Sequence, residues 1–217
     1  MPVIEVADIT LVAGSNVFDQ GSEAARIWQG MIDTISQQEG FESLYSGLQY
    51  EKPNVAQLFI VWTGLEFNER FQGRHIYRQM LKSLEPIMDG PPQLLHLKLE
   101  SCNHLASALT APVTELATLY LTAETSSFYS NLGAFAKLLV DHAQGFLGAS
   151  YSFSIENVEH EGLGAGVKGK ACQLAIGWTS ISAHLAFKET NAFRKGLEYL
   201  QEARGSEIHH TTFQTHA

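Results

Sequence analysis

Apolar positions follow two periodicities in the first hundred residues. Apolar residues spaced three and four positions apart predict amphipathic helices over residues 24–37 and 76–88. Alternating and β-branched apolar residues predict the strands, which cover residues 4–13, 43–50, 57–63 and 94–99. The resulting order, β-α-β-β-α-β, is that of a ferredoxin-like split βαβ unit.

The second half of the chain repeats this order. The segment Leu58–Thr63 reappears as Leu174–Thr179, and Gly40-Phe41 reappears as Gly145-Phe146. The repeat predicts strands over 115–123, 149–156, 173–180 and 208–215, and helices over 132–144 and 192–203. The common order and the common Trp-Thr pair indicate two homologous halves, residues 1–100 and 113–217, joined by a linker over residues 101–112.

A sheet of this kind has one face covered by helices and one open face. Two copies in one chain can bury the open faces against each other, which removes apolar surface from water. We therefore predict an α+β fold in which tandem ferredoxin-like β-α-β-β-α-β units form an intramolecular, pseudo-dimeric α+β barrel. Such a barrel needs no partner chain, and association into homo-oligomers is left open.

The net charge indicates which kinds of binding partner are disfavoured. The chain carries 14 Lys+Arg against 23 Asp+Glu, a formal net charge of −9. This field repels phosphate backbones and anionic lipid, so nucleic acid and membrane surfaces are excluded as expected partners. No apolar run approaches the roughly 20 residues that span a bilayer. The first residues lack the basic and apolar segments of a signal peptide, so we expect a cytoplasmic protein.

Three segments carry a resemblance to a known family. They are residues 59–66 (FIVWTGLE), the predicted helix over 77–88, and residues 90–97 (GPPQLLHL). The chain resembles the dimeric α+β barrel superfamily, in particular the antibiotic-biosynthesis-monooxygenase-like proteins common in fungal genomes, as a tandem version. The resemblance implies a pocket between helices and sheet in each half, and often no metal or organic cofactor. Family members include quinone-forming monooxygenases, polyketide cyclases, lactone isomerases, decarboxylases and stress-response proteins.

Histidine is the usual general base near neutral pH. His184 follows the second Trp-Thr pair by five residues, at the start of a helix, and is the first candidate for the base. The first half has Asn68 at this position, so either one half has drifted from chemical competence or the halves bind different groups. His96 and His210 occupy the same position in the last strand of each half and are the other catalytic candidates. The alternative for each histidine is structural: a local hydrogen bond for His184, and a partly exposed strand position for the other two.

Six further residues are candidates for contact with a ligand. Trp62 and Trp178 are core residues by type, and their rings would also form a flat wall for a polycyclic ligand. The further candidates are polar: Glu66 and Ser182, which follow the two tryptophans, and Tyr120 and Tyr151, whose hydroxyls could bind a carbonyl or enolate oxygen.

Cofactor and metal motifs are absent from the sequence. It contains no dinucleotide-binding G-x-G-x-x-G after a strand, no G-x-S-x-G and no H-E-x-x-H. The stretch Gly164–Ala171 imitates a phosphate-binding loop but lacks the Ser or Thr that binds Mg²⁺. We expect no cofactor and no metal site. Because residues 162–169 belong to an insert of the second half and are rich in glycine, we expect a flexible hairpin that covers a pocket.

Two functions follow from these observations. The first is a cofactor-independent enzyme of specialised metabolism that removes a proton, with the help of histidine, from a small apolar or polycyclic molecule of polyketide or terpenoid type. Monooxygenation, cyclisation and isomerisation all start from the resulting anion. The second is a non-catalytic stress-response or ligand-binding barrel.

Overall fold

The computed structural model of the chain describes residues 1–99 and 102–216. The chain divides into two compact units. Unit 1 contains Met1–Leu99 and Gln214–Ala217, and unit 2 contains Glu100–Phe213.

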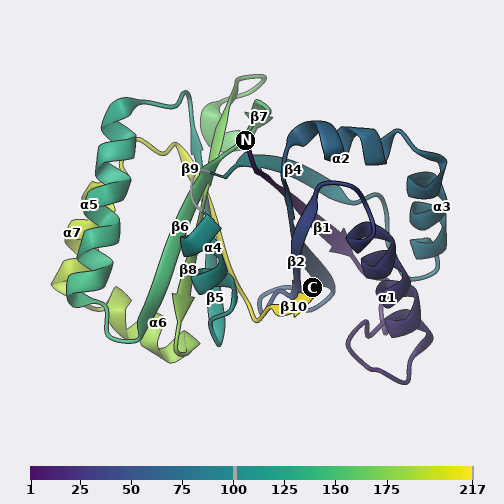
Figure 1. The fold of residues 1–217 in the computed structure, drawn as a ribbon. Helices are drawn as coiled ribbons and strands as arrows, with labels where there is room; N and C mark the ends of the chain where they lie inside the picture. The colour runs from purple at the N-terminus through teal and green to yellow at the C-terminus, as the bar shows by residue number, and fades with distance from the viewer. Residues whose placement is uncertain (100–101, 217) are drawn as a thin grey trace. The chain divides into compact units, whose positions relative to one another are not determined.

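Unit 1 is an antiparallel sheet with helices on one face (Figure 1). Its elements are β1 (Val3–Thr10), α1 (Glu23–Ser36), β2 (Phe41–Leu48), β3 (Val55–Trp62), α2 (Leu65–Gln72), α3 (His75–Leu84), β4 (Gln93–Lys98) and β10 (Gln214–His216). The strand order is β10-β2-β3-β1-β4. Helix α1 begins where Ser22 accepts a hydrogen bond from the N–H of Ala25, an N-cap that satisfies one free backbone donor.

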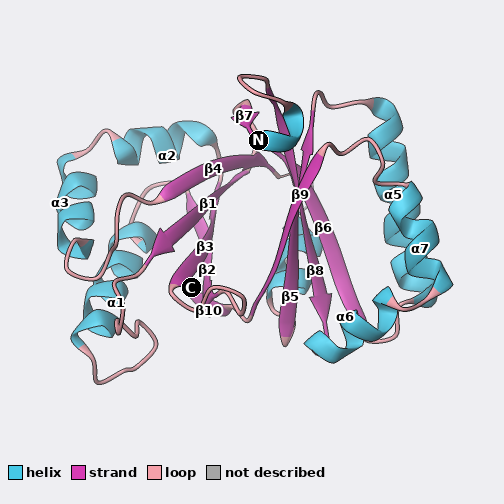
Figure 2. Cartoon of the chain, turned by 180° about the vertical axis from the view of Figure 1, so that it is seen from behind, coloured by secondary structure: helices cyan, strands magenta, loops and turns pink. Residues whose placement is uncertain are grey.

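Unit 2 has the same central order, with α5 and α7 along one face of its sheet (Figure 2). Its elements are α4 (Cys102–Leu109), β5 (Val113–Leu121), α5 (Ser126–His142), β6 (Phe146–Phe153), β7 (Val158–Glu159), η1 (Glu161–Leu163), β8 (Lys168–Trp178), α6 (Ile181–Lys188), α7 (Asn191–Glu198) and β9 (Gly205–Thr211). The strand order is β6-β8-β5-β9. The predicted α+β class is confirmed, and closure of the two sheets into one barrel stays a prediction.

The two units share local detail at the start of their second strands. Gly40 and Gly145 both have a positive φ, +82° and +87°, which favours glycine. The carbonyl of each accepts a hydrogen bond from the threonine of the Trp-Thr pair, Thr63 or Thr179. An irregularity in strand pairing follows in both units, between Phe41 and Ser43 and between Phe146 and Gly148.

In each unit, the second of the two predicted helices is preceded by a short helix that the apolar pattern did not predict. In unit 1, α2 and α3 are separated by Gly73 and Arg74, and the predicted 76–88 helix ends at Leu84. In unit 2, α6 and α7 are separated by Glu189 and Thr190. These short helices begin shortly after Trp62 and Trp178, and they carry Asn68 and His184.

The segment interpreted as a linker contains helix α4 in its described part, and residue 101 lies outside the described residues. The helix packs on β6 and β8. A Cβ placed on Gly177 would lie 2.8 Å from the Cβ of Ala111 and 3.2 Å from the Cα of Ala108, so this glycine permits close approach. Ile176 and Trp178 belong to the core under α5 to α7. Since strand side chains alternate, α4 covers the opposite face of the sheet.

The single strand predicted over 208–215 is wrong. Strand β9 ends at Thr211, and residues Gln214–His216 form the separate strand β10. β10 pairs with β2 of unit 1, where His216 Nε2 lies 2.8 Å from Ser46 Oγ. The backbone therefore satisfies its hydrogen bonds on a free sheet edge, which no local pattern can reveal.

The glycine-rich insert is held against unit 2 by several contacts. β7 pairs with β8, and the ring of His160 stacks on Tyr120 with centroids 3.8 Å apart. His160 Nδ1 also accepts a hydrogen bond from the N–H of Gly162. The insert is a hairpin, as predicted, and its mobility stays a prediction. Its expected position over a pocket is not observed, because residues 162–169 line neither of the two cavities of unit 2 described below. Among the described residues, no helix is long and apolar enough to cross a membrane.

Candidate active site

A buried carboxylate lies on the first strand of each unit. Glu115 of β5 is 7% exposed, and Glu5 of β1 is 5% exposed. Both strands direct the carboxylate toward the helices, on the same side as apolar neighbours two and four positions later. A buried charge needs polar partners, and each unit supplies a group of polar side chains for this purpose.

In unit 2 the partners of Glu115 are Trp178, His184 and His210. Trp178 Nε1–H donates to Glu115 Oε2 at 2.9 Å. His184 Nε2 lies 3.3 Å from the same oxygen, and the His184 ring stacks on Trp178. His184 Nδ1 lies 2.7 Å from His210 Nε2. His210 stands opposite Glu115 in the β5–β9 register, so strand pairing and helix α6 bring these residues together.

These contacts form a chain along which a proton can move. A hydrogen bond between two imidazoles needs one N–H and one lone pair. When His184 Nε2 carries its proton toward the carboxylate, the neutral ring has its lone pair on Nδ1 and accepts from His210 Nε2–H. When His184 takes up a second proton, it donates to both partners. Both of its nitrogens are therefore directed at protein groups.

Burial raises the pKa of Glu115 above its usual value of 4.5. The hydrogen bond from Trp178 and the charges of His210 and Lys188 lower this pKa in part. A carboxylate whose pKa lies closer to neutrality is a better proton acceptor than an ordinary surface carboxylate. The environment of Glu115 therefore suits general base chemistry.

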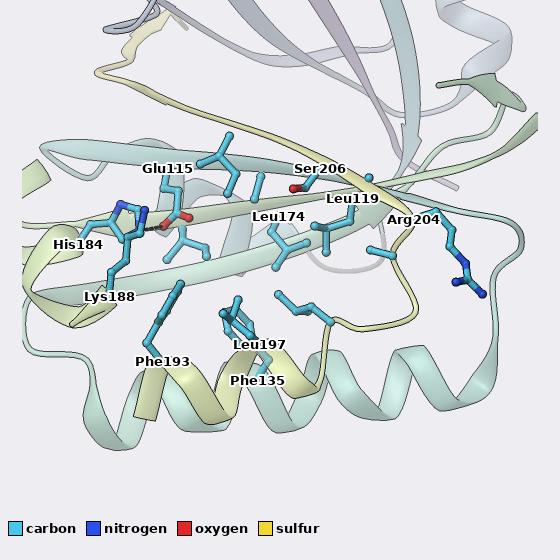
Figure 3. A pocket seen from close by; sticks show the side chains of 16 residues that line it. Glu115, Leu119, Phe135, Leu174, His184, Lys188, Phe193, Leu197, Arg204 and Ser206 are labelled. Atoms are coloured by element: carbon cyan, nitrogen blue, oxygen red, sulfur yellow. Dashed lines mark ion pairs between the residues drawn. The ribbon is translucent and has the colours of Figure 1, made fainter. Parts of the chain in front are cut away.

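A cavity of about 340 Å³ lies beside this carboxylate, between the sheet and helices α5 and α7 (Figure 3). Glu115, His184 and Lys188 stand at one end of the cavity, and Arg204 and Ser206 at the other. Most of the remaining wall is apolar; it includes Leu119, Phe135, Leu174, Phe193 and Leu197. Oε2 takes both contacts of Glu115 described above, and the second carboxylate oxygen points toward the cavity (Figure 3).

Unit 1 has the same arrangement with one decisive difference. Trp62 Nε1 and Asn68 Nδ2 both donate to Glu5 Oε2, at 3.1 and 2.6 Å. His96 Nε2 lies 2.9 Å from Asn68 Oδ1, and since that oxygen can only accept, His96 is the donor. Gln72 donates to the same oxygen. An amide keeps these hydrogen bonds but cannot take up or pass on a proton.

The cavity beside Glu5 measures only about 30 Å³. This space is comparable to the volume of one water molecule in the liquid, about 30 Å³. Side chains of Met31, Tyr77 and Met80 lie along its wall. Unit 1 thus keeps the buried carboxylate without space for an organic ligand, and unit 2 combines the carboxylate with a cavity and a histidine pair.

The buried carboxylate of unit 1 gives a stability prediction. Burial raises the pKa of Glu5. Above the unfolded value, 4.5, the folded chain therefore keeps a proton that the unfolded chain has lost, and stability falls as pH rises through the folded pKa. The fall in the free energy of unfolding amounts to about 1.4 kcal/mol for each tenfold difference in proton affinity between the folded and the unfolded chain. Glu5→Gln should remove this fall. Urea unfolding at pH 4.5, 6 and 8 measures it, and equal pH slopes for both proteins would contradict it.

The structure brings some of the predicted site residues together and not others. His184, His210 and Trp178 surround Glu115, and His96 and Trp62 belong to the equivalent group around Glu5. The remaining candidates lie elsewhere: Glu66 and Ser182 are exposed, Tyr120 stacks on His160 on the other face of the sheet, and Tyr151 lines a different cavity of unit 2.

Sequence reasoning missed Glu5 and Glu115, the buried carboxylates around which the two groups are arranged. A signal was present, because each is an acidic residue at an alternating apolar position: Glu5-x-Ala7 in one strand and Glu115-x-Ala117 in the other. The repeat is evident around the two tryptophans. The first strands of the two halves are separated by a different number of residues, so the same spacing does not pair Glu5 with Glu115. Within the described residues, no group of three or more His, Cys, Asp or Glu side chains is arranged to hold a metal ion.

Solved structures with little sequence identity resemble this chain. The structure of an anthrone oxidase-like protein has a TM-score of 0.68 at 12% identity and covers 99% of this chain and 92% of that chain. A candidate monooxygenase from Fusobacterium nucleatum has a TM-score of 0.61 at 9% identity, with 99% and 93% covered. Another from Lactobacillus acidophilus has 0.58 at 8%, with 99% and 95% covered. The chain shares their α+β fold. No family model and no curated protein matches it.

Proposed function

We propose that unit 2 is a small enzyme that removes a proton from an apolar, aromatic or polycyclic molecule without a bound cofactor. The observation that carries the proposal is the cavity of about 340 Å³ with a buried carboxylate, raised in pKa, and a histidine pair in its wall. The fold shared with the anthrone oxidase-like protein and the candidate monooxygenase structures supports aromatic and polycyclic molecules as the first substrates to test. Membership of the antibiotic-biosynthesis-monooxygenase-like proteins is part of the same proposal.

Glu115 is the proton acceptor in this mechanism. Its second carboxylate oxygen points toward the cavity, whereas both nitrogens of His184 contact protein groups. His184 and His210 hold the carboxylate in place and share its proton through their hydrogen bond. This assignment differs from the expectation that His184 itself takes the proton from the ligand. Substitution of Glu115 and of His184 distinguishes the two assignments.

Lys188 has a role after the proton has left. It lines the same cavity, and its charge already lowers the pKa of Glu115. A cation beside an enolate or phenolate stabilises the negative charge that develops during proton removal. Because Lys188 is exposed, water screens part of this interaction.

The anion then reacts further in one of two ways. With dioxygen as co-reactant, a methylene group between aromatic rings becomes a carbonyl: CH₂ and O₂ give C=O and H₂O, and the four electrons that dioxygen accepts come from the methylene carbon. Without an oxidant, the anion attacks within the same molecule, which is cyclisation, or takes up a proton elsewhere, which is isomerisation. Both begin with the step at Glu115.

Anthrone is a suitable first probe because its methylene group lies between two aromatic rings. We expect oxygen uptake with anthrone, measured with an oxygen electrode, and a new carbonyl product seen by mass spectrometry. The value of kcat/KM should fall as pH drops through the pKa of Glu115, which lies above 4.5, because the protonated carboxyl cannot accept a proton. Oxygen uptake by anthrone in buffer without protein measures the uncatalysed background.

Binding of anthrone and of polycyclic phenols without any turnover would contradict the enzyme and favour the ligand-binding protein. The closed cavity of unit 1, with Asn68 in place of a histidine, already favours a purely structural role for that unit.

A further inference from the structure

A second cavity of about 550 Å³ lies in unit 2, where α5 meets β6. β6 is the outermost strand of its sheet. The wall is mostly apolar and aromatic; it includes Leu132, Phe135, Leu139, Phe146, Leu174 and Ile176. A cavity of this size and lining matches the small-molecule sites of other proteins, about 300–1,000 Å³.

The two cavities share part of their walls. Phe135 of α5 and two residues of β8, Leu174 and Ile176, line both cavities. These three side chains are buried and lie between the two spaces. Gly196 of α7 lies against Phe135, where an added Cβ would come within 3.0 Å of the ring, so this helix leaves room for the ring.

The polar groups around the second cavity do not suit a charged ligand. Lys137 is exposed and pairs with Asp141 at 2.8 Å, and His104 is also exposed. The ring of Tyr151 packs edge-on against Tyr129. Most of the apolar side chains of the wall are buried, so the cavity favours a hydrocarbon or fused-ring portion of a ligand.

The free sheet edge is a particular feature of unit 2. In unit 1 the corresponding edge strand, β2, is covered by β10. Among the described strands none pairs with the outer edge of β6. In the part of the chain that the structure describes, the edge next to the second cavity therefore differs between the two units.

We propose that the two cavities of unit 2 form one elongated site for a hydroxylated aromatic molecule with a long apolar extension. The ring with the acidic proton lies beside Glu115, and the extension passes Phe135 into the space between α5 and β6. The position of the ring rests on the function proposed above, whereas the site for the extension rests on the shared wall alone.

A series of 4-alkylphenols, from ethyl to nonyl, tests this site through binding. Dissociation constants measured by calorimetry should fall by about fourfold for each added methylene that is buried. In the unmodified protein we expect the gain to continue to the longest chains. In Ala136→Phe, which places a ring in the second cavity from α5, the gain should stop at a shorter chain while 4-ethylphenol binds as before. Ala149→Leu narrows the same cavity from β6 and should act in the same direction.

Ser130→Phe is the control, because this exposed residue of α5 lines neither cavity. It should leave the whole series unchanged. An early plateau in the unmodified protein, or equal gains in the unmodified protein and both cavity variants, would overturn the elongated site. Glu115→Gln separates this proposal from the enzyme: it should lower turnover of anthrone by roughly 10²–10⁴ and keep the dependence on chain length. A chain-length dependence in a protein that turns over nothing would sustain the site and reject the enzyme.

Discussion

Turnover should fall by roughly 10²–10⁴ when Glu115 is replaced with Gln, the usual contribution of a positioned acid–base group. Gln has the same shape, and its carbonyl oxygen can still accept the hydrogen bond from Trp178 Nε1–H. It cannot accept a proton, so binding of anthrone should persist while kcat falls. Steady-state oxygen uptake and calorimetric binding on the same samples measure the two effects separately.

Unit 1 supplies the matched control for this substitution. Glu5→Gln changes the equivalent carboxylate in a unit whose cavity measures about 30 Å³, so turnover should stay at the level of the unmodified protein. A loss in Glu5→Gln as large as that in Glu115→Gln would show that the effect comes from folding and not from the site.

Histidine substitutions decide which group accepts the proton. His184→Ala should reduce turnover and shift the pH profile, because Glu115 loses the partner at 3.3 Å that holds it. Asn68→Ala, at the equivalent position of unit 1, should leave turnover nearly intact. Full turnover in Glu115→Gln with a complete loss in His184→Ala would identify His184 as the acceptor. A loss confined to His210→Ala or His96→Ala would place the base on the last strand.

Trp178→Ala should lower the free energy of unfolding by about 3–5 kcal/mol, the range found when a large aromatic side chain is removed from a core. Trp178 is 1% exposed and packs against the rings of Phe146 and Phe187. Its removal also takes away the indole donor to buried Glu115, which keeps its contact with His184, and a hydrogen bond lost by a buried polar group adds up to about 1–3 kcal/mol. Urea unfolding followed by far-ultraviolet circular dichroism measures the change.

Trp178→Phe divides this effect into packing and hydrogen bonding. Phe retains most of the buried ring and lacks the N–H, so its cost should be well below that of Ala. Equal costs for Phe and Ala would mean that the hydrogen bond to Glu115 dominates. A loss below about 1 kcal/mol for Ala would contradict the central packing role of Trp178, because surface substitutions typically stay within about 0.5 kcal/mol.

Local pattern was sufficient for the elements and for part of the site. Apolar periodicity predicts α1 and α5 and the main strands because buried faces must repeat with the geometry of a helix or a strand. The repeated Trp-Thr pair and the shared positions of His96 and His210 indicated two similar polar groups, since side chains on equivalent strands face the same way. His184 was selected by its place after Trp178, and the structure puts it beside that ring.

Only the tertiary structure decided how these residues combine. Glu115 meets His184 and His210 because β5 pairs with β9 and α6 returns over the sheet, contacts between residues about 70 and 95 positions apart that no spacing rule predicts. β10 leaves its own half to cover β2, because a free sheet edge satisfies backbone hydrogen bonds wherever it occurs in the chain. The two units differ in cavity volume, about 340 against 30 Å³, because volume depends on how side chains from several elements fill one space. The sequence alone thus determined the type of unit and several of its polar residues, and packing determined which unit has room for a ligand.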